Sequence, residues 1–363
     1  MKLALIRRLF SATGGAELYL QRLLQALVRA GHEPHLFAES WEGELAGVHF
    51  HSVTVTGDRT QRPTRFADAV AAELTKHTFD VTFSLERTHH QDVYRAGDGV
   101  HRVWLQRRQQ FAQWWRSPFV CAGAFHRNMM KLEARTFDPA NTRHIIVNSD
   151  MVRREILEHF HFPASRIHLV RNGIDLDRYR RGHRNATRER FGIKPDDTLL
   201  LFVGSGWERK GLRFVLRAFH RLKAPRVKLL VVGKGKPPFA VPDGVIFAGP
   251  MTDVENAYAA ADLLLFLPIY EPSSNVVAEA LVSDLPVITT SLNGASEIIT
   301  PRKNGTVIAD PRDTDAVVEA IRHWIMQRGQ AEMPPKDELS LERNVEETLA
   351  VLEMAAREKA RGR

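Results

Sequence analysis

Two hydrophobic patterns alternate along most of this chain: short apolar runs and longer runs with a helical period. An apolar run at residues 3–6 is followed by a helical run that ends before Gly31. The leucines of that helical run are Leu18, Leu20, Leu23, Leu24 and Leu27. Further apolar runs, each predicted to be a buried strand, lie at residues 35–38, 81–84, 145–147, 167–170, 199–203, 228–232, 245–247, 263–266, 286–289 and 306–308. Strands that alternate with helices predict an α/β fold with parallel, doubly wound sheets.

The alternation restarts after a turn signal at Asn172-Gly173, which predicts two such domains in tandem. The arginine-rich segment 178–190 is predicted to be a linker or an exposed helix. The chain ends in a predicted helix from residue 338 to residue 363. One face of that helix carries Leu341, Val345, Leu349 and Leu352. The expected domains are therefore residues 1–170 and 171–337, followed by the terminal helix 338–363.

Composition narrows the class of protein. The 363 residues are 44% hydrophobic and 26% charged, which is typical of a globular protein with room for two domains. The single cysteine, Cys121, excludes an internal disulfide framework and suits a reducing compartment. No signal peptide or membrane-spanning run is visible, so the cytoplasm is the expected location. The formal charge of +8 suggests an anionic partner such as a phosphate, a membrane surface or nucleic acid.

Two strand-to-helix loops carry residues suited to a phosphate group. Gly14-Gly15 follows the first predicted strand, where a ligand could approach the backbone at a helix N-terminus. It is not a dinucleotide fingerprint, and a plain tight turn is the alternative. Arg209-Lys210-Gly211 occupies the corresponding loop of the second domain. Two adjacent cations there suit a pyrophosphate, although they could also be solvated surface charges.

The stretch from Glu271 to Glu279 is the most informative part of the chain. Glu271 follows the predicted strand 263–266, and Glu279 lies about two turns into the next predicted helix. The small and polar residues between them include Ser274, Asn275 and Val276, whose backbone N–H groups could bind an anion. Two carboxylates on either side of an anion site fit a sugar attached to a nucleoside diphosphate. The alternative is a pair of solvated helix charges.

A Gly-flanked loop in the first domain contains Asp98, with His101 nearby. A carboxylate in such a loop could transfer a proton or orient an acceptor hydroxyl, although Asp-Gly is also common in turns. The Asp175-Leu176-Asp177 sequence has the form of a metal-binding motif, but no cluster of oxygen ligands accompanies it. No Cys/His spacing suggests zinc, so no metal is expected.

A basic and aromatic segment covers about residues 100–135. Residues 98–135 contain seven Lys or Arg against two acids, together with three of the six tryptophans of the chain. On the helix predicted from residue 103 to residue 115, Trp104, Phe111 and Trp115 cluster on one face. Such a face suits the surface of an anionic membrane, while a core helix or a protein partner is the alternative. No binding motif or basic stripe indicates nucleic acid.

Together these residues resemble the retaining glycosyltransferases of family 4, which have the GT-B fold. The resemblance covers nearly the whole chain and rests on Gly14-Gly15, Gly31-His32, residues 172–175, Arg209-Lys210-Gly211 and the Glu271–Glu279 pair. Residues 40–43, residues 203–205 and the Trp/Arg segment are similar to those of bacterial lipopolysaccharide core glucosyltransferases that act on heptose. The resemblance implies two Rossmann-like domains facing a central cleft. Residues 1–170 would bind the acceptor, residues 171–337 the donor, and the terminal helix would pack back on the first domain.

The resemblance also implies roles for the site residues. Arg209 and Lys210 would hold the diphosphate, helped by the backbone at Gly14-Gly15. Glu271 would bind the donor sugar and Glu279 the ribose. The backbone at residues 274–276 (Ser274, Asn275 and Val276) would complete the phosphate and sugar cradle. Asp98, Lys210 and Glu271 are the candidate catalytic residues.

The expected function is the transfer of a hexose, glucose from UDP-glucose, to a heptose of the lipopolysaccharide core. Another donor such as UDP-N-acetylglucosamine or GDP-mannose is an alternative, as is a catalytically weak scaffold that binds nucleotide and membrane. The expected partners are a nucleotide sugar, a lipid-linked saccharide acceptor and an anionic membrane surface, with no cofactor, metal or nucleic acid. The expected location is peripheral, on the inner face of the cytoplasmic membrane.

Overall fold

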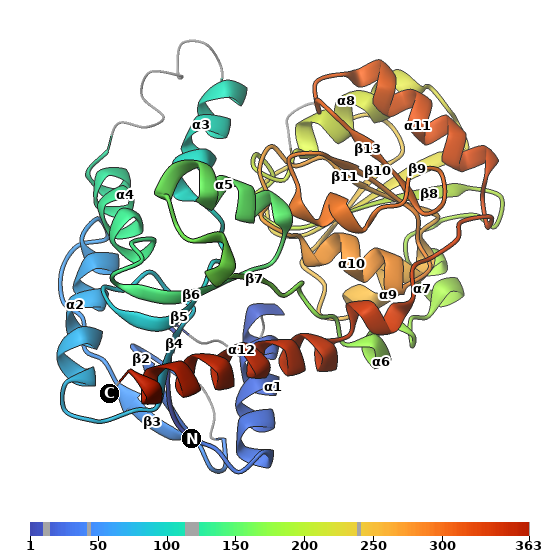
Figure 1. Cartoon of the computed structure of the whole chain (residues 1–363). Helices are drawn as coiled ribbons and strands as arrows, with labels where there is room; N and C mark the ends of the chain where they lie inside the picture. The colour runs from blue at the N-terminus through green and yellow to red at the C-terminus, as the bar shows by residue number, and fades with distance from the viewer. Residues whose placement is uncertain (10–14, 42–44, 113–122, 238–240, 363) are drawn as a thin grey trace. The chain divides into compact units, whose positions relative to one another are not determined.

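The computed structural model describes residues 1–9, 15–41, 45–112, 123–237 and 241–362 (Figure 1). The chain divides into two compact units. The first unit is Met1–Arg171 together with Glu342–Arg363, and the second is Asn172–Leu341. Both units are parallel α/β structures, which confirms the predicted fold class.

The first unit is built on a seven-stranded sheet in the order β3-β2-β1-β4-β5-β6-β7, and all strand pairs are parallel. Its strands are β1 (Lys2–Ile6), β2 (Glu33–Ala38), β3 (His49–Ser52), β4 (Val81–Ser84), β5 (Gln91–Arg95), β6 (Thr142–Val147) and β7 (Ile167–Leu169). Its helices are α1 (Gly15–Arg29), α2 (Arg62–Leu74), α3 (His101–Phe111), α4 (Ala124–Thr136), α5 (Asp150–Phe160) and, from Glu342 on, α12 (Leu341–Arg361).

The second unit contains a six-stranded parallel sheet in the order β10-β9-β8-β11-β12-β13. Its strands are β8 (Thr198–Val203), β9 (Val227–Val232), β10 (Val245–Gly249), β11 (Leu263–Phe266), β12 (Val287–Thr290) and β13 (Gly305–Ile308). Its helices are α6 (Leu176–Tyr179), α7 (Arg184–Arg190), α8 (Leu212–Leu222), α9 (Val254–Ala260), α10 (Asn275–Val282) and α11 (Thr314–Met326). Every predicted apolar run of this unit overlaps a strand, because parallel strands covered on both faces are nearly all apolar.

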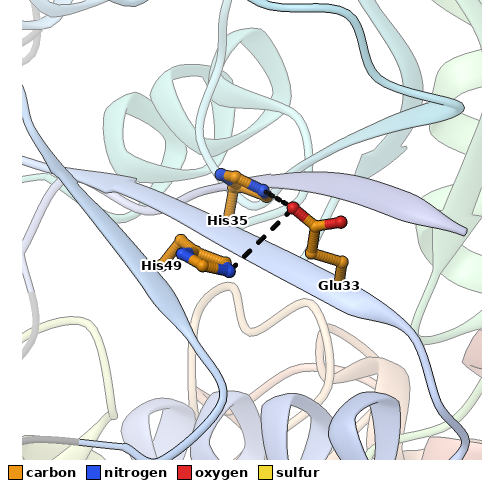
Figure 2. A group of neighbouring side chains, drawn as sticks. All are labelled: Glu33, His35 and His49. Atoms are coloured by element: carbon orange, nitrogen blue, oxygen red, sulfur yellow. Dashed lines mark hydrogen bonds and ion pairs between the residues drawn. The ribbon is translucent and has the colours of Figure 1, made fainter.

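The apolar pattern did not predict two strands of the first unit, β3 and β5, because both carry polar residues. On β5, the buried Asp92 accepts hydrogen bonds from Thr82 of β4, and Lys359 of α12 donates to it at 2.8 Å. On β3, which is the edge strand, His49 lies beside His35 of β2 (Figure 2). Polar side chains that are paired in this way are compatible with a strand, but they leave no hydrophobic signal in the sequence.

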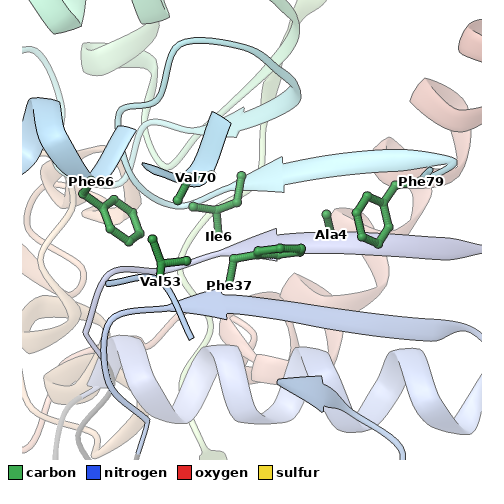
Figure 3. Close-up of a cluster of buried hydrophobic side chains, with 7 residues drawn as sticks. All are labelled: Ala4, Ile6, Phe37, Val53, Phe66, Val70 and Phe79. Carbon is green, nitrogen blue, oxygen red and sulfur yellow. The ribbon is translucent and has the colours of Figure 1, made fainter. Parts of the chain in front are cut away.

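The core of the first unit includes a cluster between one face of the sheet and helix α2 (Figure 3). Ala4 and Ile6 lie on this face of β1 because they are two residues apart, and the fully buried Phe37 of β2 packs with them. The other members of the cluster are Val53, Phe66, Val70 and Phe79. Burial of each large side chain stabilises the unit by about 1.5–3 kcal/mol.

Of the two alternatives predicted for the arginine-rich segment 178–190, a linker or an exposed helix, the structure has helices, although some of their side chains are buried. The segment forms α6 and α7, and Arg188 is 6% exposed. The carboxylate of Asp262 accepts hydrogen bonds from Arg184 at 2.6 Å and from Arg188 at 3.4 Å. Arg328 also contacts Asp262, at 3.0 Å. These guanidinium groups therefore have a structural role around one buried carboxylate, with Arg188 buried and Arg184 and Arg328 partly exposed.

The predicted terminal helix begins later than residue 338. A short 3₁₀ turn covers Lys336–Leu339, and α12 runs over Leu341–Arg361. Leu341, Val345 and Leu352 are buried along α12, as the helical spacing predicts, and Leu349 is partly buried. Within the described ranges, no helix has both the length and the apolar character needed to cross a membrane.

Candidate active site

The candidate site lies at the topological switch point of the second sheet. Strands β8 and β11 are neighbours, but the chain continues from β8 to β9 on one side and from β11 to β12 on the other. In open parallel sheets, ligands bind beyond the carboxyl ends of the strands at such a point. Arg209 and Lys210 follow β8, and Glu271 follows β11. The fold therefore brings the predicted basic pair and the predicted carboxylate to the same edge.

Glycines allow the two loops to approach each other closely. Gly211 has φ 76°, and a Cβ atom there would lie 1.7 Å from the carbonyl oxygen of Leu267 in the β11 loop. At Gly204, where φ is 141°, a Cβ atom would lie 2.5 Å from the side chain of Lys210. At Gly211 both the conformation and the backbone contact require glycine, whereas at Gly204 the positive φ favours glycine and the flexible Lys210 side chain is the neighbour.

Lys210 is the more buried member of the basic pair. Its Nζ lies 5.7 Å from the ring centroid of Phe266. Burial lowers the pKa of Lys210, while Glu271 and Glu279 raise it. A desolvated ammonium group gains more from an incoming phosphate than a solvated one, because electrostatic attraction is less screened there. Lys210 is thus well placed to bind the charge of a diphosphate.

Arg209 is paired with Glu271. Its guanidinium donates a hydrogen bond to the carboxylate of Glu271 and lies 3.4 Å from the carbonyl oxygen of Tyr270. Arg209 carries several donors, so it can hold Glu271 and a phosphate oxygen together. The family resemblance implies that Arg209 holds a phosphate and Glu271 the donor sugar, and the structure adds that the two side chains contact each other.

The loop that carries Glu271 is fastened by Asn293, a residue that the sequence analysis missed. The backbone N–H of Glu271 donates to the carbonyl oxygen of Leu292, and the N–H of Gly294 donates to the carbonyl oxygen of Glu271, both at 2.9 Å. The fully buried Asn293 donates from Nδ2 to Ser274 Oγ at 2.9 Å and accepts from the Ser274 N–H at 3.2 Å. This network fixes the start of helix α10.

Helix α10 begins at Asn275, with Ser274 at the N-cap, so Asn275 and Val276 form the first turn. N–H groups in a first turn have no partner within their own helix, and the helix dipole favours an anion there. Asn172 supports this turn, because its Nδ2 donates to the Ser273 carbonyl at 3.0 Å and to Asn275 Oδ1 at 2.9 Å. The Ser274 N–H is engaged by Asn293, so within the predicted cradle at residues 274–276 the N–H groups of Asn275 and Val276 are the candidate anion donors.

Glu279 lies one turn further along α10 and is held by two tyrosines. Tyr258 Oη donates to Glu279 Oε2 at 2.6 Å, and Tyr179 also hydrogen-bonds the carboxylate. The rings of Tyr179 and Tyr258 contact each other edge to face, 5.5 Å apart. Burial raises the pKa of Glu279, and the tyrosine hydroxyls oppose that rise. Glu279 is a fixed acceptor suited to sugar hydroxyls, and neither tyrosine was predicted.

Asp98 lies in the first unit, in the loop between β5 and α3. Arg87 holds this loop in place, because it donates hydrogen bonds to the Gly99 carbonyl at 2.8 Å and to Glu133 at 3.0 Å. Glu133, which is 1% exposed, accepts hydrogen bonds from the backbone N–H groups of His101 and Arg102 and so caps helix α3. Asp98 is exposed on this fixed loop.

A pocket of about 560 Å³ adjoins the Asp98 loop within the first unit. Four guanidinium groups line it, against the carboxyl groups of Glu86 and Asp98. The four arginines are Arg8, Arg59, Arg62 and Arg87. An anionic or hydroxyl-rich ligand suits such a lining.

Two predicted features fall partly outside the described residues. Gly15 begins helix α1, whereas Gly14 is outside the described ranges. In the Trp/Arg segment, α3 ends at Phe111, and Trp115 is likewise outside. Phe111 is 6% exposed and Trp104 is partly buried. Phe111 therefore packs into the first unit, contrary to the membrane face predicted for it.

Two parallel-sheet units, one with a basic pair and a helix N-terminus at its switch point, define the GT-B class of glycosyltransferases. Residues 13–178 match the model described as Glycosyltransferase Family 4, and residues 197–327 match the model described as Glycosyl transferases group 1. The chain therefore belongs to the glycosyltransferases of family 4, and it is an enzyme of the hexosyltransferase class.

Individual relatives support this assignment. The chain is 28% identical over 335 residues to the lipopolysaccharide glucosyltransferase WaaG of Escherichia coli K12, which covers 86% of this chain and 87% of that protein. The crystal structure of WaaG, a glycosyltransferase involved in lipopolysaccharide biosynthesis, superposes with a TM-score of 0.77 at 25% identity and covers 98% of each chain. Anabaena Alr3699/HepE, solved with UDP and glucose, has the same fold, with a TM-score of 0.68 at 16% identity and coverage of 98% of this chain and 100% of that one.

Proposed function

We propose that this enzyme transfers glucose from UDP-glucose to a heptose of the lipopolysaccharide core, with retention of the anomeric configuration. The observation that carries the proposal is the grouping of Arg209, Lys210 and Glu271 at the switch point of the second sheet. The 28% identity to an E. coli lipopolysaccharide glucosyltransferase over most of both chains supports the choice of donor and acceptor.

The proposal assigns the donor to the second unit. Lys210 and Arg209 bind the diphosphate, together with the N–H groups of the first turn of α10. Glu271 accepts hydrogen bonds from hydroxyls of the transferred sugar, and Glu279 accepts them from the ribose. The tyrosine pair around Glu279 holds its carboxylate in place before the donor arrives, which reduces the ordering cost of binding.

The proposal assigns the acceptor to the first unit. The pocket beside Asp98 is rich in arginine, so it suits a saccharide that carries phosphate or carboxylate groups. Asp98 accepts a hydrogen bond from the reacting hydroxyl and orients its oxygen. The hydrogen bonds that Arg87 and Glu133 make with the backbone of the Asp98 loop hold the loop in place, which makes this orientation specific.

The chemical step that we propose needs no metal ion. The bond between the sugar C1 and the diphosphate oxygen breaks while a bond from C1 to the acceptor oxygen forms on the same face. The acceptor proton passes to the departing phosphate oxygen, so the products are UDP and the new glycoside. Negative charge grows on the diphosphate during this step, and Lys210 and Arg209 stabilise it. Neither glutamate needs to act as an acid or a base.

Transfer assays with the full chain test the proposal. The acceptor is lipopolysaccharide truncated at the inner-core heptose, and the donors compared are UDP-glucose, UDP-N-acetylglucosamine and GDP-mannose. We expect transfer from UDP-glucose with an α-linkage by NMR, and loss of transfer in Glu271→Ala. Faster transfer from another donor would overturn the choice of sugar. A β-linkage would overturn retention, and UDP binding without any transfer would support the scaffold instead.

The proposal includes a peripheral position on the inner face of the cytoplasmic membrane, based on the arginines and Trp104 of helix α3. Sedimentation with anionic vesicles tests it. Because Phe111 is buried, the informative variants are Trp104→Ser and Trp115→Ser, with wild type as reference. We expect weaker sedimentation with unchanged UDP binding. Unchanged sedimentation would show that these residues face the core or a protein partner.

A further inference from the structure

One face of the β2–β3 pair gathers histidine and glutamate side chains that the transfer reaction does not use (Figure 2). Glu33 and His35 are two residues apart on β2, so they share a face of the sheet. His49 of the edge strand β3 pairs with His35 in the strand register, which places both imidazoles side by side. The rings of His35 and His49 stack with centroids 4.6 Å apart.

The distances within this group suit a shared metal ion. Glu33 Oε1 lies 2.9 Å from His35 Nε2 and 3.9 Å from His49 Nε2, and one ligand atom from each residue lies within 4.8 Å of the others. Ligands bound tetrahedrally at about 2.0–2.2 Å from a zinc ion are separated by about 3.3–3.6 Å. The 2.9 Å distance is shorter than this ligand separation and the 3.9 Å distance is longer, so small side-chain rotations would complete the site.

We propose that Glu33, His35 and His49 bind one divalent transition-metal ion of the zinc class. Two imidazole nitrogens and one carboxylate oxygen are borderline donors that favour zinc over magnesium or calcium. Water fills the fourth position, because the described residues offer three ligands in this group. The side chain of His49 is 58% exposed, which leaves a path for the ion to enter.

The other ring nitrogen of His35 contacts His51. His35 Nδ1 lies 2.8 Å from His51 Nε2, and the His51 ring stacks on Phe37 at 4.4 Å with an interplanar angle of 8°. When the ion takes His35 Nε2, the proton of the neutral ring moves to Nδ1 and is donated to His51 Nε2. His51 thus fixes the tautomer and the orientation of a metal-bound histidine, as partners of metal ligands commonly do.

The contact between His35 and His51 also favours the Glu33–His35–His49 group over a second candidate metal group beside it. His51, Glu73 and His77 also place ligand atoms within 4.8 Å of one another. His51 is engaged by His35 through Nε2, so it serves the first site better as a partner than the second site as a ligand. Lys2 Nζ lies 3.9 Å from Glu33 Oε1 and competes for that carboxylate, but its side chain is 37% exposed and can move away.

The position of the site indicates a structural role. Glu33 is the first residue of β2, so the site lies toward the amino ends of the strands, while Asp98 follows the carboxyl end of β5. An ion held by β2 and β3 would link the short edge strand to the sheet. A ligand that binds only the folded protein stabilises it.

The test uses the untagged full chain, stripped with a chelator and titrated with Zn²⁺ by calorimetry. Co²⁺ then serves as a spectroscopic probe of coordination. We expect one Zn²⁺ per chain, a tetrahedral Co²⁺ spectrum and a higher unfolding temperature with zinc. His49→Ala should weaken binding at least about tenfold, and His51→Phe by about tenfold. The matched control His90→Ala changes an exposed histidine outside the group and should bind as wild type.

Further variants make the proposal easy to overturn. Lys2→Gln removes the competing charge and should tighten Zn²⁺ binding. Absence of stoichiometric binding, or equal binding by His49→Ala and wild type, would overturn the proposal. Loss of binding in His77→Ala with full binding in His49→Ala would place the ion in the neighbouring group and would also overturn it. Each of these variants should keep its transfer activity when zinc-free, because none lies at the candidate active site.

Discussion

The two units share one sheet plan, but they differ in the segment that leaves the strand at the switch point. The order β3-β2-β1-β4-β5-β6 of the first unit corresponds to β10-β9-β8-β11-β12-β13 of the second. At both switch points a basic residue meets a glutamate: Arg7 lies 3.2 Å from Glu86 in the first unit, and Arg209 pairs with Glu271 in the second. After β11 the chain enters helix α10, whereas β4 is joined to β5 by residues 85–90 without a helix.

That difference is the reason why we propose the diphosphate site at the second switch point. The first turn of α10 supplies backbone donors and a favourable dipole next to the basic pair. In the first unit, burial raises the pKa of Glu86, and the surrounding arginines line a pocket instead of a phosphate loop. On the proposed function, the same plan would serve the donor in one unit and the acceptor in the other.

The largest expected effect concerns the scaffold of the second unit. Asp262→Ala leaves Arg184, Arg188 and Arg328 without their shared carboxylate, and it also removes the acceptor of the Leu199 N–H at 2.8 Å. We expect a loss of about 3–5 kcal/mol in the free energy of unfolding, measured by denaturant titration. The exposed control Asp243→Ala should change it by less than about 0.5 kcal/mol. Equal values for both variants would refute the structural role of the arginines.

The next effect concerns catalysis. Lys210→Ala removes the partly buried cation expected to stabilise the departing diphosphate, and kcat should fall by about 10²–10³-fold. Steady-state kinetics with UDP-glucose measure the change. Lys303→Ala is the surface control. Arg7→Ala changes the first-unit counterpart of Arg209, and a loss of UDP affinity in this variant, measured by calorimetry, would erase the distinction between the two switch points.

A smaller effect is expected at the tyrosine pair. Tyr258→Phe removes the hydroxyl that donates to Glu279 and leaves the Tyr179 contact in place. UDP binding, measured by calorimetry, should weaken by about tenfold, since a hydrogen bond to a charged group contributes about 1.5–3 kcal/mol. Tyr94→Phe, a buried tyrosine of the first unit, is the control. Unchanged affinity in Tyr258→Phe would show that Glu279 does not depend on this contact.

A separate effect is expected in the pH dependence of the first unit. Burial, reinforced by Arg87, lowers the pKa of His101 from 6.5 to about 4. Below pH 6.5 the unfolded chain therefore takes up a proton that the folded chain refuses until about pH 4. Stability from this group is present above pH 6.5 and is lost as the pH falls through that window. Unfolding titrations from pH 7 to pH 4.5 should show a shallower decline in His101→Asn than in wild type, and an equal slope would contradict it.

The comparison also shows what could be predicted from the sequence. The strands of the second unit carry continuous apolar runs, and Arg209, Lys210, Glu271 and Glu279 stand at positions set by those strands. The strands of the second unit and the positions of these four residues relative to the strands were therefore predictable. Asn293 and Tyr258 were not, because their roles depend on contacts between loops that are distant in the chain.

The first unit was harder to predict for a related reason. Strand β3 offers His-Phe-His-Ser, in which the histidines meet partners from β2, so no apolar pattern marks it. Likewise, Arg188 looks like a solvated charge until the fold brings it to Asp262. Polar residues that are buried in pairs carry no signal at the level of one segment.

The division of labour between the units is tested most directly by calorimetric titration of UDP into wild type, Lys210→Ala and Asp98→Ala. We predict one UDP per wild-type chain, affinity at least about tenfold weaker in Lys210→Ala, and wild-type affinity in Asp98→Ala. Wild-type affinity in Lys210→Ala, or an equal loss in Asp98→Ala, would contradict a donor site confined to the second unit.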